Sequence, residues 1–151
     1  MSLTLVLAWV FSLVGWQTPW GPTDADFNEL ALSWMFFLPA GLMFITSGFM
    51  HTVFAKYTAK NIGWVTNGFQ KELGFVSWGI GVAGLVASGM GSDAWLVLTI
   101  VISFFLLLAG AQHIQEIIKQ KNFAPGNTVV LIYDIGLPVS LWILLSMGGF
   151  I

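Results

Sequence analysis

The sequence predicts an all-α integral membrane protein, a bundle of four transmembrane helices preceded by a shorter apolar helix. Of the 151 residues, 57% are hydrophobic and only 8% are charged. Soluble domains carry about a quarter charged residues, so this composition indicates that the bilayer is the solvent. The mean hydropathy of +0.86 agrees with that conclusion. The third observation is a series of apolar segments of helical length separated by polar loops.

The chain contains five apolar segments, which are Leu3–Trp16, Leu30–Phe54, Leu73–Met90, Ala94–Ile114 and Thr128–Ile151. The last four approach or exceed the roughly 20 residues that cross a hydrocarbon core of ~30 Å. The first is short, so we expect it to tilt, to lie partly in the interface or to extend through Gln17 and Thr18. It lacks a basic region and a clear cleavage site, and we expect it to be a helix of the mature protein.

These segments predict one transmembrane domain over residues 1–151. An N-terminal helix lies within residues 1–20, a first helical hairpin within 27–90 and a second within 94–151. Pro39 and Pro138 fall inside two of the segments and predict kinks. The small residues Gly74, Ser77, Gly81, Gly84 and Ser88 recur at helical spacing and predict a face for close helix packing.

The charges predict the orientation of the helices. The five basic residues are all lysines and fall in two loops, as Lys56, Lys60, Lys71, Lys119 and Lys121. By the positive-inside rule these loops are cytoplasmic, so the N-terminus is also cytoplasmic. The other loops carry Asp24, Asp26, Glu29 and Asp93 without any lysine. No basic face exists for nucleic acid, and the lack of cysteine excludes disulfides and thiolate metal sites.

Four polar residues are predicted to share one depth in the membrane. His51, Glu72, His113 and Asp134 each lie a few residues from the lysine loops, which places them within about 10 Å of the cytoplasmic boundary. An offset of 62 residues aligns the Gly-x-x-His of 48–51 with that of 110–113, and Glu-Leu-Gly with Asp-Ile-Gly. The alignment predicts parallel repeats with two His–carboxylate pairs.

These residues allow two interpretations. In the structural one, Glu72 favours a helix N-terminus, Asn67 and Gln70 form a capping box, Asn127 is an N-cap, and the histidines hydrogen-bond the acids. In the functional one, the cluster binds a non-haem metal ion, holds a haem between His51 and His113, or conducts protons. Gln70, Glu116 and Asn127 are its supporting residues. The sequence requires no cofactor and contains no hydrolase constellation.

The chain resembles an uncharacterised family of small bacterial membrane proteins, similar in style to the DoxX-like four-helix proteins. The matching residues cover about two thirds of the chain and are His51, Ile62-Gly63-Trp64, Phe69-Gln70, Glu72, Gly74, Gly110, His113, Gly126-Asn127, Asp134 and Pro138. The resemblance implies a multi-pass protein of the bacterial cytoplasmic membrane. The first segment and the acidic loop Asp24–Glu29 fall outside the matching region.

Three functions are consistent with these features. The leading hypothesis is a non-catalytic accessory or structural subunit that packs in a larger membrane complex, respiratory or otherwise bioenergetic, or in a homo-oligomer. Its basis is the glycine-rich packing face and the small extramembrane mass. The first alternative is a metal-, haem- or quinone-binding redox protein that uses the His/carboxylate cluster. The second is a small-solute or proton transporter with a polar route from the Asp93 side to Asp134.

Overall fold

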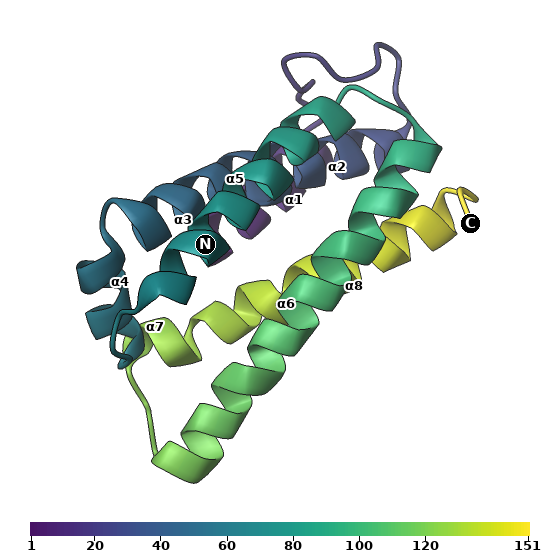
Figure 1. Ribbon diagram of the computed structural model, residues 1–151. Coiled ribbons are helices and arrows are strands. Elements are labelled where there is room, and N and C mark those ends of the chain that lie inside the picture. Colours follow the sequence, from purple (N-terminus) through teal and green to yellow (C-terminus); the bar gives the residue numbers. More distant parts are fainter.

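The computed structural model describes residues 1–151, and all of its regular elements are helices (Figure 1). The prediction of an all-α fold is confirmed. The elements are α1 (Ser2–Leu13), α2 (Phe27–Met35), the π-helix η1 (Phe36–Leu42), α3 (Met43–Thr52), α4 (Ala55–Ile62), α5 (Gly68–Ala87), α6 (Ser92–Gln120), α7 (Pro125–Thr128) and α8 (Val130–Met147).

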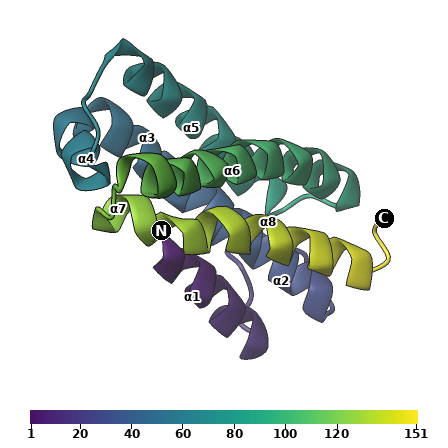
Figure 2. The same cartoon turned by 90° about the horizontal axis from the view of Figure 1, so that it is seen from below.

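The helices form two packed pairs. In the first pair α5 lies along η1 and α3, and in the second α8 lies along α6 (Figures 1 and 2). Helix α2 contacts α8 and joins the pairs, while α1 packs on α2, η1 and α8. The short helices α4 and α7 contact each other at one end of the molecule. Helices α5 and α6 are joined by a short loop and diverge from it toward the end where α4 and α7 lie.

Three helical stretches are long and apolar enough to cross a membrane, namely Phe27–Thr52, Ser92–Gln120 and Pro125–Met147. The fourth predicted span corresponds to α5, which has 20 residues but is not among them. Its first turns contain Gln70, Lys71 and Glu72, and these residues lower its hydropathy. Helix α1 is a shorter apolar helix of 12 residues. Four spans and a cytoplasmic N-terminus therefore stay predictions.

Local hydrogen bonds explain where two of the helices begin. At α2, Glu29 N–H donates to Asp26 Oδ1 (2.9 Å) and Asp26 N–H donates to Glu29 Oε2 (3.1 Å), which is a complete capping box. At α5, Gln70 N–H donates to Asn67 Oδ1 (3.3 Å). The expected return bond, from the Asn67 N–H to the Gln70 amide oxygen, is not made, and the Gln70 amide nitrogen donates to the Ala55 carbonyl (2.9 Å).

Pro39 lies within the π-helix η1, where it cannot donate a backbone hydrogen bond. π-Helix is rare in proteins and occurs mostly as short segments inside α-helices, as it does here. The buried Tyr133 hydroxyl donates to the Pro39 carbonyl (2.6 Å), which links η1 to α8. Pro138, by contrast, lies inside α8, which continues past it as one α-helix.

We expect Tyr133→Phe to lower the free energy of unfolding by about 0.6 kcal/mol and by no more than ~1.7 kcal/mol. These figures are the average and the largest value measured for side-chain hydrogen bonds between membrane helices, and the ring of Phe keeps the packing. Unfolding in mixed micelles, followed by circular dichroism, measures the change. Tyr57→Phe is a suitable control, because Tyr57 is exposed on α4. A larger loss of stability in Tyr57→Phe than in Tyr133→Phe would contradict a stabilising role for the hydrogen bond from Tyr133 to Pro39.

The small residues of α5 pack inside the chain. Gly74, Ser77, Gly81, Gly84 and Ser88 are all buried. A Cβ atom added to Gly81 would lie 2.7 Å from the Ile45 nitrogen, and one added to Gly84 would lie 2.7 Å from the Ala40 carbonyl. The face therefore brings the backbones of α5, η1 and α3 together.

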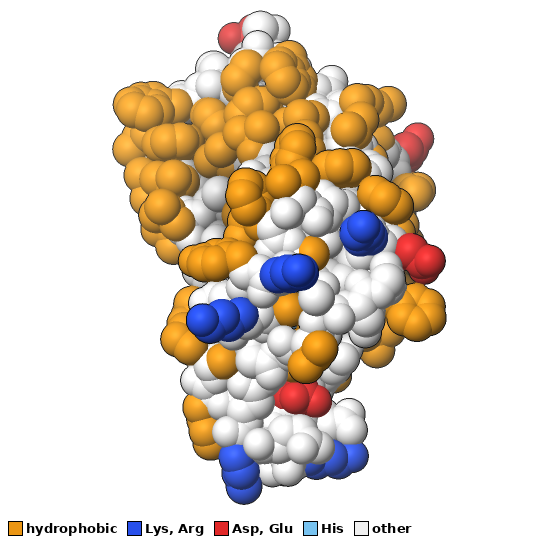
Figure 3. Space-filling model, turned by 60° about the vertical axis from the view of Figure 1, so that its left-hand side comes forward, with side chains coloured by type: hydrophobic (Ala, Val, Ile, Leu, Met, Phe, Trp, Pro, Cys, Tyr) orange, Lys and Arg blue, Asp and Glu red, His pale blue; other side chains and the backbone are white.

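The two ends of the molecule differ in charge. The exposed lysines gather at the end where α4 and α7 meet, as Figure 3 shows, and they are Lys56, Lys60, Lys71, Lys119 and Lys121. At the opposite end, near the start of α2 and of α6, lie Glu29 and Asp93. Between the ends, large apolar side chains fill the core, among them Phe36, Trp95, Leu137, Leu141, Leu144 and Leu145.

Candidate functional site

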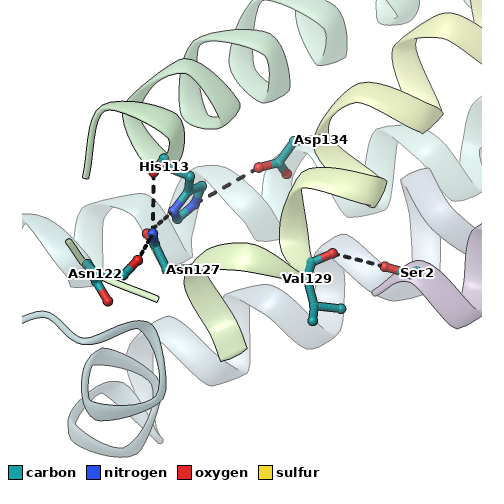
Figure 4. A network of polar contacts seen from close by, with 6 residues as sticks. All are labelled: Ser2, His113, Asn122, Asn127, Val129 and Asp134. Atoms are coloured by element: carbon teal, nitrogen blue, oxygen red, sulfur yellow. Dashed lines mark hydrogen bonds and ion pairs between the residues drawn. The ribbon is translucent and has the colours of Figure 1, made fainter. Parts of the chain in front are cut away.

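A buried polar network lies near the lysine-bearing end, where α6, α7 and α8 meet (Figure 4). His113 comes from α6, Asn127 from α7 and Asp134 from α8. Asn127 is fully buried, while His113 and Asp134 are 8% and 2% exposed. The sequence brings these residues together because Lys121, in the left-handed conformation, ends α6 and the chain then turns back through α7 into α8.

Asn127 fixes the orientation of the His113 ring. Its amide nitrogen donates to two backbone carbonyls, those of Asn122 (2.9 Å) and His113 (3.3 Å). The amide oxygen is consequently the atom that faces His113 Nδ1, at 2.7 Å. An oxygen accepts here, so Nδ1 must carry the hydrogen. In a neutral imidazole the other nitrogen, Nε2, is then an acceptor.

That acceptor faces a carboxylate. His113 Nε2 lies 4.0 Å from Asp134 Oδ2, which is too long for a direct hydrogen bond. Asp134 Oδ2 is buried and has no hydrogen-bond partner. Buried polar atoms are nearly always paired, since an unpaired one costs about 1–3 kcal/mol. The pair therefore presents two acceptors with no hydrogen bond between them, of which Asp134 Oδ2 is buried.

Both residues line a cavity of about 510 Å³ between the two helix pairs. His51 and Trp64 also line it, together with apolar residues of α5 and α6 that include Leu73, Phe104, Leu108 and Ala109. A second cavity of about 630 Å³ shares Met1, Ile62, His113 and Val130 with the first. The network thus forms the polar wall of an otherwise mostly apolar space.

Trp64 was not predicted as a site residue, although it belongs to the motif that carries the family resemblance. Its ring stacks on His113, with centroids 5.4 Å apart and an interplanar angle of 15°. Its indole nitrogen is buried and has no hydrogen-bond partner. Asn122 was also missed; its amide donates to the Ile62 carbonyl (2.9 Å) and so ties the α4 end to the loop before α7. The signals for Trp64 were its place in the Ile62-Gly63-Trp64 motif and its position between two lysine-bearing turns.

The first repeat does not form the predicted His–carboxylate pair. The His51 Nδ1 atom lies 3.4 Å from the Gln70 amide, while Glu72 is exposed and forms no ion pair. Gly74 faces α3, and residue 72 lies about 200° away around the helix, on the outside. Asp134 occupies the equivalent place in α8, but it faces the neighbouring helix α6. Its Cβ atom lies 3.3 Å from a Cβ atom built on Gly110.

The supporting residues differ in their surroundings. Gln70 contacts His51 and the α4 backbone, and Asn127 lies inside α7, so it is not the N-cap that its sequence context suggested. Glu116 is half-buried on α6 and forms no ion pair. No group of three or more His, Asp or Glu side chains lies close enough to hold a metal ion. The histidines and acids therefore do not converge into one cluster.

Comparison with known proteins identifies the family of the chain. No curated protein and no solved structure is significantly similar to it. The model of one protein family matches residues 1–148, which include the first apolar segment and the acidic loop Asp24–Glu29. These two regions were expected to fall outside the family match, and that expectation was wrong. The chain belongs to DUF6790, a family of unknown function, in agreement with the uncharacterised family that the sequence resembles.

Proposed function

We propose that this small helical membrane protein binds a lipid-soluble molecule with a polar head in the cavity between its two helix pairs. The observation that carries this proposal is the unpartnered oxygen of Asp134, which is buried and lines the cavity beside His113. Ligand sites are typically apolar spaces with a few convergent polar groups. A ligand that donates to Asp134 would supply the missing partner.

The route to this cavity is proposed to run from the lipid. Phe104 and Leu108 line the cavity and are also 69% and 67% exposed on α6, a helix long enough to span the membrane. Their exposed surface would therefore face acyl chains. Because α5 and α6 diverge toward the lysine-bearing end, an apolar molecule would enter between them and place its head against Asp134.

Binding of two small probes tests this function. We expect 2-phenylethanol or 2-phenylethylamine, or both, to bind the protein in lipid nanodiscs, as measured by equilibrium dialysis. Ala109→Phe should abolish that binding, because Ala109 lines the cavity and the added ring would occupy part of its volume. Ala111→Phe is the matched control, since Ala111 lies on the same helix and is exposed.

The histidines provide a second measurement. The chain contains only two, so labelling with ¹⁵N-histidine yields two imidazole spectra, which His51→Gln assigns. Binding in the cavity should shift the Nε2 signal of His113. If the wild type and Ala109→Phe take up both probes equally and the His113 signal does not move, the proposed function is wrong.

The other functions considered from the sequence have less support. The subunit hypothesis rested partly on a small-residue face, and that face is occupied within the chain by η1 and α3. A transporter would need a polar route through the half of the molecule that contains Trp95, Leu141 and Leu145, which are all buried apolar residues. Assembly with other subunits and a location in the bacterial cytoplasmic membrane stay predictions, and co-purification from native membranes tests the first.

A further inference from the structure

We infer that the ligand carries a primary or secondary amine, which donates to both His113 Nε2 and Asp134 Oδ2. This inference rests on the proposed function and names the chemical class of the ligand. It depends on three properties of the cavity, which are the spacing of the two acceptors, the charge of its lining and the apolar character of the rest of its wall.

The spacing fits a donor with two hydrogens. Hydrogen bonds of about 2.8 Å from one nitrogen to two acceptors 4.0 Å apart would diverge by about 90°, close to the angle between two N–H bonds. A hydroxyl group has one hydrogen and would leave one of the two acceptors unpaired. A tetrahedral zinc ion would hold its nitrogen and oxygen ligands about 2.0 Å away, and thus about 3.3 Å from each other. The observed pair is too far apart for that.

The charge of the lining selects against anions. Asp134 is the only formally charged side chain among the residues that line the cavity, and none of the five lysines is among them. The N-terminal ammonium of Met1 is also among the lining groups, but it forms no ion pair with Asp134, so a carboxylate or phosphate head placed against the Asp134 oxygen would be repelled. An ammonium head instead gains a charge-assisted hydrogen bond, which is about twice as strong as a neutral one.

The rest of the wall favours an apolar body on that amine. Leu73, Phe104, Phe105 and Leu106 contribute aliphatic and aromatic surface, and the Trp64 ring stacked on His113 forms a flat aromatic wall. Such surface binds hydrocarbon or aromatic groups by removing their apolar area from lipid headgroups or water. The cavity therefore matches an amphipathic amine rather than a small hydrophilic one.

A matched series of probes tests the inference. The probes are 2-phenylethylamine, 2-phenylethanol, 3-phenylpropionate and phenethyltrimethylammonium, each measured by equilibrium dialysis against protein in nanodiscs of neutral lipid. We expect the amine to bind the wild type at least tenfold more tightly than the alcohol, and the carboxylate not to bind. The quaternary ammonium keeps the charge but has no N–H group, so it should bind at least tenfold more weakly than the amine.

Asp134→Asn tests whether Asp134 is the group that selects the amine over the alcohol. This substitution keeps the shape of the side chain, removes its charge and should bring the affinity of the amine to within about threefold of that of the alcohol. Glu116→Gln is the matched control, because Glu116 is a half-buried carboxylate of α6 that does not line the cavity, and it should leave the preference for the amine unchanged.

The outcomes separate this inference from the proposed function. Equal or tighter binding of the alcohol in the wild type overturns the amine assignment while the ligand site stands. So does a quaternary ammonium that binds as tightly as the amine, and this result needs no variant to fold. If no probe distinguishes the wild type from Ala109→Phe, the site itself is rejected.

Discussion

Gly84→Ala is expected to lower the free energy of unfolding by about 3 kcal/mol. The new methyl group would lie 2.7 Å from the carbonyl carbon and oxygen of Ala40 and 2.8 Å from the nitrogen of Gly41. These are backbone atoms of η1, which cannot rotate away as a flexible side chain can. Inserting one methyl group into a well-packed interior typically costs 1–3 kcal/mol, and rigid neighbours place this site at the upper end.

Gly79→Ala is the matched control in the same helix. Gly79 is exposed, and no heavy atom lies within 4 Å of an added Cβ atom. Because alanine has the higher helix propensity, this variant should be neutral or more stable by up to ~1 kcal/mol. Unfolding in mixed micelles measures both variants. Equal effects at the two positions would mean that helix propensity, and not the contact between α5 and η1, determines the outcome.

Helix positions were largely predictable because they depend on local composition. The apolar segments located the long helices, and the 3-4 spacing of Gly81, Gly84 and Ser88 placed them on one face of α5, where the structure also buries them. The π-helix was not predicted. Pro39 indicated an irregularity because it has no N–H group, but an apolar pattern does not specify the hydrogen-bond register of residues 36–42, and the Tyr133 hydroxyl that donates to the Pro39 carbonyl lies 94 residues away in the sequence.

The candidate site was predictable only in part. Counting residues from the lysine loops predicted the same membrane depth for His113 and Asp134. In the structure, His113 Nε2 lies 4.0 Å from Asp134 Oδ2. Depth alone does not specify rotation about the helix axis, which is why the same reasoning paired His51 with Glu72 although Glu72 points outward. The rotation of α5 is set by its packing on α3, and the rotation of α8 by its packing on α6.

Asn127→Ala is expected to lower the free energy of unfolding by about 2–4 kcal/mol. The substitution removes the acceptor of His113 Nδ1 and the donor to the Asn122 and His113 carbonyls, all within a buried network. Each buried polar group left without a partner costs about 1–3 kcal/mol, and partial access of water to the new space keeps the total below the sum. Asn61→Ala is the control, since Asn61 is exposed on α4.

The same variant tests whether Asn127 positions His113 or merely supports the fold. With Asn127 present, its amide oxygen requires the hydrogen on Nδ1 and leaves Nε2 free to face Asp134. Without it, both ring nitrogens compete for the hydrogen, because the tautomer of a histidine follows the hydrogen bond of its second nitrogen. We expect the ¹⁵N signals of His113 to move toward a mixture of tautomers, whereas those of His51, which contacts Gln70 instead, stay unchanged. A destabilised protein whose His113 spectrum is identical to that of the wild type would assign Asn127 a structural role alone.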